Sequence, residues 1–272
     1  MPKSHKAELC RCCKSELELF SSARVLSYKA DYYQCTNCGS LQIENPHWIG
    51  EAHSAAISDL DTGLVARCLS ASRLIGVFLF LQGRNKWTGI DWGGGTGLLT
   101  RLLRDQGYDV LSYDKYIDGQ HSKGFNITSN AVNFSKDFLI AIECFEHLED
   151  PIGLLLNAVA KKDYFIFTTE IINSPPPDPA KGEWWYFMPE SGQHITFASK
   201  AGLTAFSKHL GFNFLTSFGS LHIMSRKRIK FKTRSLLKVR PFRQLLILIV
   251  PELLSKRQSL TLLDKEFLSK KL

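Results

Sequence analysis

The sequence predicts an α/β protein with a mostly parallel central sheet, helices on both faces and a closing antiparallel hairpin. Short apolar strand segments alternate with amphipathic helical segments over most of the chain, and the last two, Phe212–Phe218 and Leu221–Ser225, are separated only by Gly219-Ser220. The 272 residues are 44% hydrophobic and 22% charged, which excludes disordered, collagen-like and coiled-coil chains. This length suits one large domain with small additions.

The N-terminal residues 1–45 are predicted to form a zinc-ribbon-like module. Five of the seven cysteines lie in the first forty residues, and four of them form two C-x2-C pairs on either side of an alternating, aromatic-rich segment. Four thiolates make a closed tetrahedral zinc site, which is structural because it has no open position. The predicted ligands are Cys10, Cys13, Cys35 and Cys38. Cys12 either replaces Cys13 as a ligand or stays a reduced thiol.

The elements after this module follow a strand–helix alternation. Residues 46–86 are expected to form a helical connector, since leucines recur at helical spacing as far as Leu81. The main domain, residues 87–228, begins with a strand at Trp87–Trp92, a glycine-rich turn and a helix from Leu98 to Gln106. The other expected elements are strands at Tyr108–Tyr113, Phe138–Ile142 and Asp163–Thr168, and helices at Pro151–Ala160 and Ser199–Leu210.

The turn Asp91-Trp-Gly-Gly-Gly-Thr-Gly97 is the densest turn signal in the chain. A strand, a glycine loop and a helix in this order bind a phosphate or a nucleoside in α/β sheets. A dehydrogenase motif G-x-G-x-x-G beginning at Gly93 requires glycine where Leu98 stands, which disfavours a nicotinamide enzyme. The next strand ends on Asp114, 21 residues after Gly93, about the spacing at which a carboxylate meets a ribose.

The loop resembles the first motif of class I S-adenosylmethionine-dependent methyltransferases. The resemblance rests on a D-x-G-x-G-x-G pattern formed by Asp91, Gly93, Gly95 and Gly97. Asp114 supports it, as does the segment 143–151, which is similar to the E-H-x-x-D-P segment after the fourth strand of many such enzymes. The resemblance covers roughly residues 58–228. It implies a Rossmann-like methyltransferase sheet with S-adenosylmethionine as cofactor.

The resemblance also implies roles for individual residues. The loop glycines let the backbone approach the methionine part of the cofactor, and Asp114 accepts the ribose hydroxyls. Asp91 either fixes the loop, meets the cofactor's ammonium through water or caps the following helix. A shortened second crossover leaves the adenine contact open between Asn126 and Ile127, and Glu143 either lines the cofactor or is a solvated loop acid. The predicted cofactor-binding residues are Asp91, Gly93, Gly94, Gly95, Gly97, Asp114, Asn126 and Glu143.

Methyl transfer to a hydroxyl or an ammonium also requires a base. The candidate catalytic residues are Glu146, His147 and His194, with packing or capping as the alternative for each histidine. The segment Gly192–Phe197 resembles a G-Q-H-I-x-F segment of bacterial methyltransferases associated with sugars and surface polysaccharides. The aromatic run Trp184-Trp-Tyr-Phe187 before it is interpreted as a substrate lid or as core packing.

The positive charge is confined to the C-terminal segment. The net charge is +8, but residues 221–272 carry +11 and the first 220 residues carry −3. The basic extension 229–272 has three interpretations: it contacts an anionic membrane with Leu245–Val250 shallowly inserted, it binds RNA phosphates, or it is a docking or solvated face. Because no apolar run appears long enough to span a bilayer, we expect a cytoplasmic protein, either free or peripheral at the inner membrane face.

Three functions are compatible with these patterns. The first is methyl transfer to a sugar, a nucleotide sugar or a surface glycan. The second is RNA methylation, because zinc-ribbon rRNA methyltransferases join similar modules; Glu143-Cys-Phe-Glu146 stands where amino-directed enzymes carry an Asn- and Pro-rich tetrad, so nucleic acid is the weaker alternative. The third is a non-catalytic methyltransferase-like scaffold, which the intact glycine motif and Asp114 disfavour.

Overall fold

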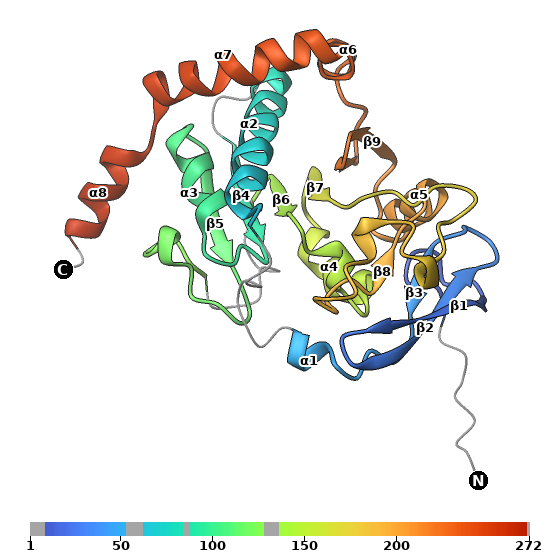
Figure 1. The fold of residues 1–272 in the computed structure, drawn as a ribbon. Helices are drawn as coiled ribbons and strands as arrows, with labels where there is room; N and C mark the ends of the chain where they lie inside the picture. Colours follow the sequence, from blue (N-terminus) through green and yellow to red (C-terminus); the bar gives the residue numbers. More distant parts are fainter. Residues whose placement is uncertain (1–8, 53–61, 84–86, 128–135, 271–272) are drawn as a thin grey trace.

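The computed structural model describes residues 9–52, 62–83, 87–127 and 136–270, and among them a six-stranded sheet forms the centre (Figure 1). In spatial order the strands are β5 (Asp109–Tyr113), β4 (Thr88–Trp92), β6 (Phe138–Ala141), β7 (Tyr164–Thr168), β10 (Leu221–Ser225) and β9 (Phe214–Phe218). The first four are parallel, and β10 runs antiparallel to both of its neighbours, β7 and β9. This confirms the predicted α/β sheet with its closing hairpin.

Helices cover both faces of this sheet, because successive strand residues point to opposite sides. Leu139, Phe165 and Phe167 pack with α4 (Pro151–Val159) and α5 (Lys200–His209). Their neighbours along the strands face the other side. There Phe138, Ile140 and Ile166 pack with α2 (Leu64–Gln82), α3 (Leu98–Asp105) and α7 (Arg240–Gln258). The near-continuous apolar runs of the central strands reflect burial on both faces.

Helix α2 is the main element of the predicted helical connector, and the short α1 (Ile49–Ala52) is the other; residues 53–61 and 84–86 lie outside the described residues. By length and composition α2 is apolar enough to cross a membrane, with a mean hydropathy of 1.8 over 18 residues, of which 39% are buried. The sequence did not indicate this apolar length, because Arg67 and Arg73 interrupt the apolar run. In the structure its second half, including Ile75, Phe78 and Leu79, packs into the core.

The described part of the crossover between β5 and β6 contains the one-turn helix η1 (Gln120–Ser122) and an isolated parallel bridge between Ser112 and Asn126. Residues 128–135 of this crossover lie outside the described residues, so a shortened crossover stays a prediction. The carboxyl end of β5 is therefore flanked by a loop that returns beside the glycine turn.

A second, four-stranded sheet joins the N-terminal module to the rest of the chain. Its order is β1 (Leu17–Val25), β2 (Tyr28–Cys35), β3 (Leu41–Ile43) and β8 (Thr196–Phe197). The two-residue β8 comes from the segment just before α5, and Leu41 pairs with Phe197 (Figure 1). The module thus shares hydrogen bonds with a segment more than 150 residues away, which local sequence patterns do not indicate.

The basic C-terminal extension folds into three helices, α6 (Phe231–Lys238), α7 and α8 (Thr261–Ser269). Helix α7 crosses α2, and its Val250 and Leu254 are buried in the core on that face (Figure 1). Helix α8 is fixed to α3 by Asp264, which is 5% exposed and lies 2.7 Å from Arg104 Nη2 and 2.8 Å from Arg101 Nη1. The extension therefore packs against the domain through buried charges as well as apolar contacts.

Candidate functional site

The glycine turn lies between β4 and α3 at the carboxyl edge of the sheet. The N–H groups of Gly93 and Gly94 donate to Tyr113 O at 2.7 and 3.1 Å, which fixes the turn to the end of β5. Gly97 has a φ of +77°, and a Cβ there would lie 2.0 Å from Ser122 Oγ, so backbone and space both require glycine. A Cβ on Gly95 would meet nothing within 4 Å, so the turn borders open space.

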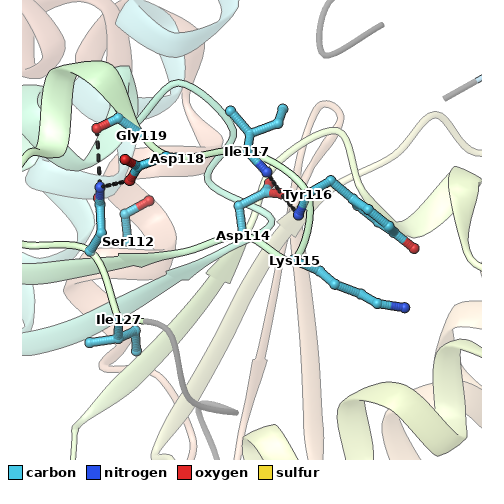
Figure 2. Close-up of a pocket in the computed structure, with 9 residues that line it drawn as sticks. Ser112, Asp114, Lys115, Tyr116, Ile117, Asp118, Gly119 and Ile127 are labelled. Atoms are coloured by element: carbon cyan, nitrogen blue, oxygen red, sulfur yellow. Dashed lines mark hydrogen bonds between the residues drawn. The ribbon is translucent and has the colours of Figure 1, made fainter. Parts of the chain in front are cut away.

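Asp114 ties the glycine turn to the loop that follows β5. Its Oδ2 accepts a hydrogen bond from Gly95 N at 3.0 Å. Its Oδ1 accepts bonds from Tyr116 N at 2.8 Å and Ile117 N at 3.0 Å (Figure 2). Two carboxylate oxygens offer about four acceptor positions, so these three bonds leave capacity for one more donor.

Asp114 also lines a cavity of about 330 Å³ with the residues around it. The lining residues are Ser112, Asp114, Lys115, Tyr116, Ile117, Asp118, Gly119, Asn126 and Ile127. Asn126 Nδ2 donates to Asp118 Oδ1 at 2.8 Å and to Gly119 O at 3.1 Å, which joins three of these residues. Asn126 and Ile127 therefore share a cavity with Asp114, and an adenine contact by either stays a prediction. The sequence did not indicate residues 115–119 as part of the site, although they directly follow Asp114.

Asp91 is a buried carboxyl below the turn. It accepts a hydrogen bond from Thr100 Oγ1 at 2.9 Å, which joins β4 to α3. Gly97, the N-cap residue of α3, has no side chain to cap this helix. The backbone N–H of Thr100, in the first turn of α3, also stabilises the Asp91 carboxylate, so the capping role stays a prediction. Burial raises the pKa of Asp91 to about 6, while the Thr100 hydroxyl opposes the rise. Asp91 thus positions the loop from within the core.

Glu143 follows β6 and is held in place by two partners. Its carboxylate lies 3.1 Å from Arg67 Nε and accepts a hydrogen bond from Thr168 Oγ1 at 2.7 Å. Its φ of +52° is unusual for a residue with a side chain. The next residue, Cys144, contacts Gly93, whose Cβ would lie 2.6 Å from the Cys144 Sγ. Glu143 is therefore a positioned acid beside the glycine turn, and Arg67 is a partner that the sequence did not indicate.

The three candidate catalytic residues are brought together at this end of β6. Glu146 and His147 lie on the single turn η3 (Phe145–His147), and His194 precedes β8. Their possible ligand atoms all lie within 4.8 Å of one another, and the two imidazole centroids are 5.0 Å apart. Ile195 N donates to Glu146 O at 2.8 Å, which fastens the two segments together. We call these three side chains the Glu-His-His cluster.

Burial sets the protonation states of this cluster. It raises the pKa of Glu146 to about 8, and the charge of Glu143 adds to the rise. Burial lowers the pKa of His194 to about 4, although the hydrogen bond to Tyr186 O opposes this. Without a ligand, the structure therefore favours a protonated Glu146 and a neutral His194 at neutral pH.

The four predicted zinc ligands converge in the N-terminal module. Cys10 Sγ lies 3.6 Å from Cys38 Sγ, Cys13 Sγ lies 3.4 Å from Cys35 Sγ, and all four sulfurs lie within 4.8 Å of one another. A zinc tetrahedron with arms of about 2.3 Å has sulfur–sulfur edges of about 3.8 Å, so the donor set fits this ion. Cys12 is buried but belongs to no such group among the described residues, which favours Cys13 as the ligand.

The aromatic run at 184–187 is divided between core and surface. Tyr186 and Phe187 are buried among core residues of the second sheet, so core packing applies to them. Trp185 is 69% exposed. Together with Trp184 it lines a second cavity, of about 270 Å³, which Pro179 and Glu190 also border.

Comparison with a family model identifies a methyltransferase domain in this chain. Residues 68–217 match the model of a methyltransferase domain family. Magnesium protoporphyrin IX methyltransferase from Synechocystis, solved with S-adenosylhomocysteine, is 13% identical with a TM-score of 0.45, covering 65% of this chain and 90% of that one. An O-methyltransferase family protein from Burkholderia thailandensis is 13% identical with a TM-score of 0.48, covering 68% of each chain. No curated protein sequence matches the chain.

Proposed function

Because this chain belongs to the methyltransferase domain family, we propose that it transfers the methyl group of S-adenosylmethionine to a hydroxyl of a sugar, a nucleotide sugar or a surface glycan. The observation that carries the cofactor assignment is the Asp114 carboxylate. It receives Gly95 N–H at 3.0 Å and borders a cavity of about 330 Å³. A ribose hydroxyl is a donor, and the acceptor position that remains on this cavity-lining carboxylate suits it.

The reaction requires an acceptor oxygen in line with the sulfonium. The oxygen forms a bond to the methyl carbon while the carbon–sulfur bond breaks, and the sulfur keeps the electron pair as neutral S-adenosylhomocysteine. The hydroxyl proton must leave the acceptor. The Glu-His-His cluster follows the same strand end as Cys144, which contacts Gly93, so we assign activation of the acceptor to this cluster.

Trp184 and Trp185 favour a sugar as acceptor. The C–H faces of sugar rings pack on aromatic rings, and the cavity beside these two tryptophans is lined by further aromatic and proline side chains. The rings of Trp184 and Trp185 contact the Tyr186 ring, with centroids 5.1 and 5.3 Å away, and Tyr186 O accepts from His194 Nδ1 at 2.7 Å. Tyr186 therefore connects the tryptophans to the cluster that would meet the acceptor.

Calorimetric titration with S-adenosylhomocysteine tests the cofactor assignment, with NADH as the negative ligand. Asp114→Asn should weaken binding by about 1 to 3 kcal/mol, because it removes a charge that receives ribose hydroxyls. Glu266→Gln, on the exposed surface of α8, is the matched control and should bind as the wild type does. Wild-type protein that binds neither ligand would favour the scaffold function instead.

The acceptor is identified by transfer of labelled methyl from S-adenosylmethionine to nucleotide sugars, glycans and rRNA fragments in parallel. Trp185→Ala should raise the KM for the sugar and leave cofactor affinity unchanged, since Trp185 is exposed and outside the cofactor cavity. Methylation of the rRNA fragments alone would contradict a sugar acceptor and support RNA methylation.

We also propose that the four-cysteine group binds one structural zinc ion. Its chemistry supports this, since four converging thiols match the closed sites in which zinc stabilises a small sheet. Metal analysis of protein purified without chelator should find zinc, and its absence from folded protein would contradict the proposal.

A peripheral contact with an anionic membrane is the third part of the proposal, and it corresponds to a location at the inner membrane face. On α7, Phe242, Leu245 and Ile249 are 55%, 53% and 54% exposed at spacings of three and four residues, which form one face of a helix. Exposed Lys238 and Arg240 lie at the start of this face. Apolar side chains with adjacent cations suit shallow insertion among anionic lipids.

Vesicle sedimentation tests this contact with phosphatidylglycerol and phosphatidylcholine vesicles. The wild type should sediment with the anionic vesicles only, and Leu245→Gln/Ile249→Gln should remain in solution. Leu154→Gln changes a similarly exposed leucine on α4, at 51%, and should behave as the wild type does. Equal sedimentation of the α7 variant, or none of the wild type, would remove the membrane contact.

A further inference from the structure

The Glu-His-His cluster joins three metal-ligand side chains that are far apart in the sequence. Glu146 and His147 come from η3, and His194 comes from the segment before β8. Their ligand atoms lie within 4.8 Å of one another, and the imidazole rings are nearly perpendicular at 83°. This cluster is separate from the four cysteines and uses nitrogen and oxygen donors only.

The buried carboxyl of Glu146 lacks a well-formed hydrogen bond from the described residues, although the Tyr186 hydroxyl and the charge of Arg67 stabilise its ionised form. Its side chain is fully buried, and neither carboxyl oxygen has a hydrogen-bond partner in the described structure. Buried polar atoms are nearly always hydrogen-bonded or bound to an ion or water, because an unmade bond costs about 1 to 3 kcal/mol. The two orphan oxygens therefore point to a missing ligand.

His194 is oriented for ligation by a bond on its far nitrogen. Its Nδ1 lies 2.7 Å from Tyr186 O, and since a carbonyl oxygen only accepts, Nδ1 carries the proton. A neutral imidazole has one N–H, so Nε2 keeps its lone pair for a ligand. Metal-binding histidines are usually fixed in this way by a carbonyl or a carboxylate.

We propose that Glu146, His147 and His194 bind a divalent cation of the transition series. Two imidazoles and one carboxylate are the donors that zinc, iron and related ions accept, and three protein ligands leave at least one coordination position open. A cation at this position would compensate the buried carboxylate in addition to Arg67, whose charge also stabilises it. His147 is only half-buried, so the cluster is accessible from solvent on that side.

Such a cation gives the cluster a definite action on the acceptor. A hydroxyl oxygen bound at the open position loses its proton to water more readily, which makes it a better nucleophile toward the methyl carbon. This consequence rests on the proposed function, whereas cation binding itself does not. The two can therefore fail separately.

The test is calorimetric titration of Zn²⁺ into protein that keeps metal in its cysteine group after dialysis against a weak chelator. The wild type should bind one further ion. Glu146→Gln, which preserves shape, and His147→Ala should each weaken this binding at least tenfold. His209→Ala, an exposed histidine at the end of α5, is the matched control and should not change it.

Two further measurements make the outcome decisive. Co²⁺ bound at this site should give a visible spectrum without the thiolate charge-transfer band of cysteine coordination. S-adenosylhomocysteine binding by each variant shows that it is folded. A wild type that binds no additional ion, or variants that bind it equally well, would overturn the proposal. Zinc binding without any S-adenosylhomocysteine binding would instead contradict the proposed function.

Discussion

The two ends of the chain are attached to the central domain in different ways. The N-terminal module contributes three strands to a sheet that β8 completes, and β8 directly follows His194. Buried Arg11 strengthens this connection, since it donates to Ile43 O at 2.8 Å, Ile195 O at 2.7 Å and Thr196 Oγ1 at 3.1 Å. The C-terminal helices pack on α2 and α3, and they leave one face of α7 exposed.

The N-terminal module therefore contributes to the candidate site, whereas the C-terminal extension only covers the domain. The N-terminal module holds the segment that carries one residue of the Glu-His-His cluster. The C-terminal extension contacts neither the glycine turn nor this cluster through any described hydrogen bond, and its buried contacts serve stability. Perturbing the first should therefore change acceptor chemistry, while perturbing the second should change stability or location.

The largest effect is expected from Cys38→Ala, because it removes one zinc ligand. Loss of the ion should destabilise the N-terminal sheet by about 5 kcal/mol or more and abolish methyl transfer, while S-adenosylhomocysteine still binds. Thermal unfolding, metal content and calorimetry measure the three effects. Cys12→Ala is the matched control, since Cys12 is also buried but lies outside the sulfur group. Zinc loss in that variant would make Cys12 a ligand in place of Cys13.

Asp264→Asn should lower the free energy of unfolding by about 2 to 3 kcal/mol at neutral pH, since it removes the buried counter-charge of Arg104 and Arg101, which keep the partly exposed Asp109 and Asp105. Burial alone would raise the pKa of Asp264, but hydrogen bonds from Arg104 and Arg101 hold it below its ordinary value. This stabilisation is present above the ordinary carboxyl pKa and is lost as pH falls through the lowered value. Urea unfolding should therefore find the variant closer to the wild type in acid.

Glu266→Gln on the same helix is the control for that experiment, because Glu266 is exposed and pairs only with Lys270 among the described ion pairs. It should change the free energy of unfolding by less than about 0.5 kcal/mol. A loss of unfolding free energy in Asp264→Asn that does not depend on pH would contradict the ionic explanation.

Arg11→Met should cost about 2 kcal/mol, since it removes charged hydrogen bonds to three buried acceptors but keeps the apolar stem. Its informative readout is kinetic. Because Arg11 holds residues 195 and 196 next to His194, kcat should fall while cofactor affinity stays unchanged. Unchanged kcat in a folded variant would mean that the module does not position the cluster.

The parts of the fold with local signals were predictable from the sequence. The strands around the glycine turn, the closing hairpin and the cysteine pairs each depend on short-range periodicity, turn residues or spacing. The structure brings Asp114 to the glycine turn and the four cysteines together, as those patterns indicate.

The remaining features depend on long-range pairing. A two-residue strand such as β8 has no periodicity of its own, and its partner β3 is more than 150 residues away. The sequence did not predict two ion pairs, Arg67–Glu143 and Arg104–Asp264, for the same reason. A charged residue is expected on the surface unless its buried partner is known. The sequence did not indicate the apolar length of α2, because Arg67 and Arg73 interrupt it.

Hydrogen–deuterium exchange with and without S-adenosylhomocysteine tests the central claim most directly. The account predicts that the cofactor slows exchange in the glycine turn, residues 93–97, and in residues 112–119, where amides border the cavity. Exchange in residues 10–43 and in 231–269 should not change. Protection absent from the turn and the Asp114 loop, or found only in the terminal additions, would contradict the assignment of the cofactor site.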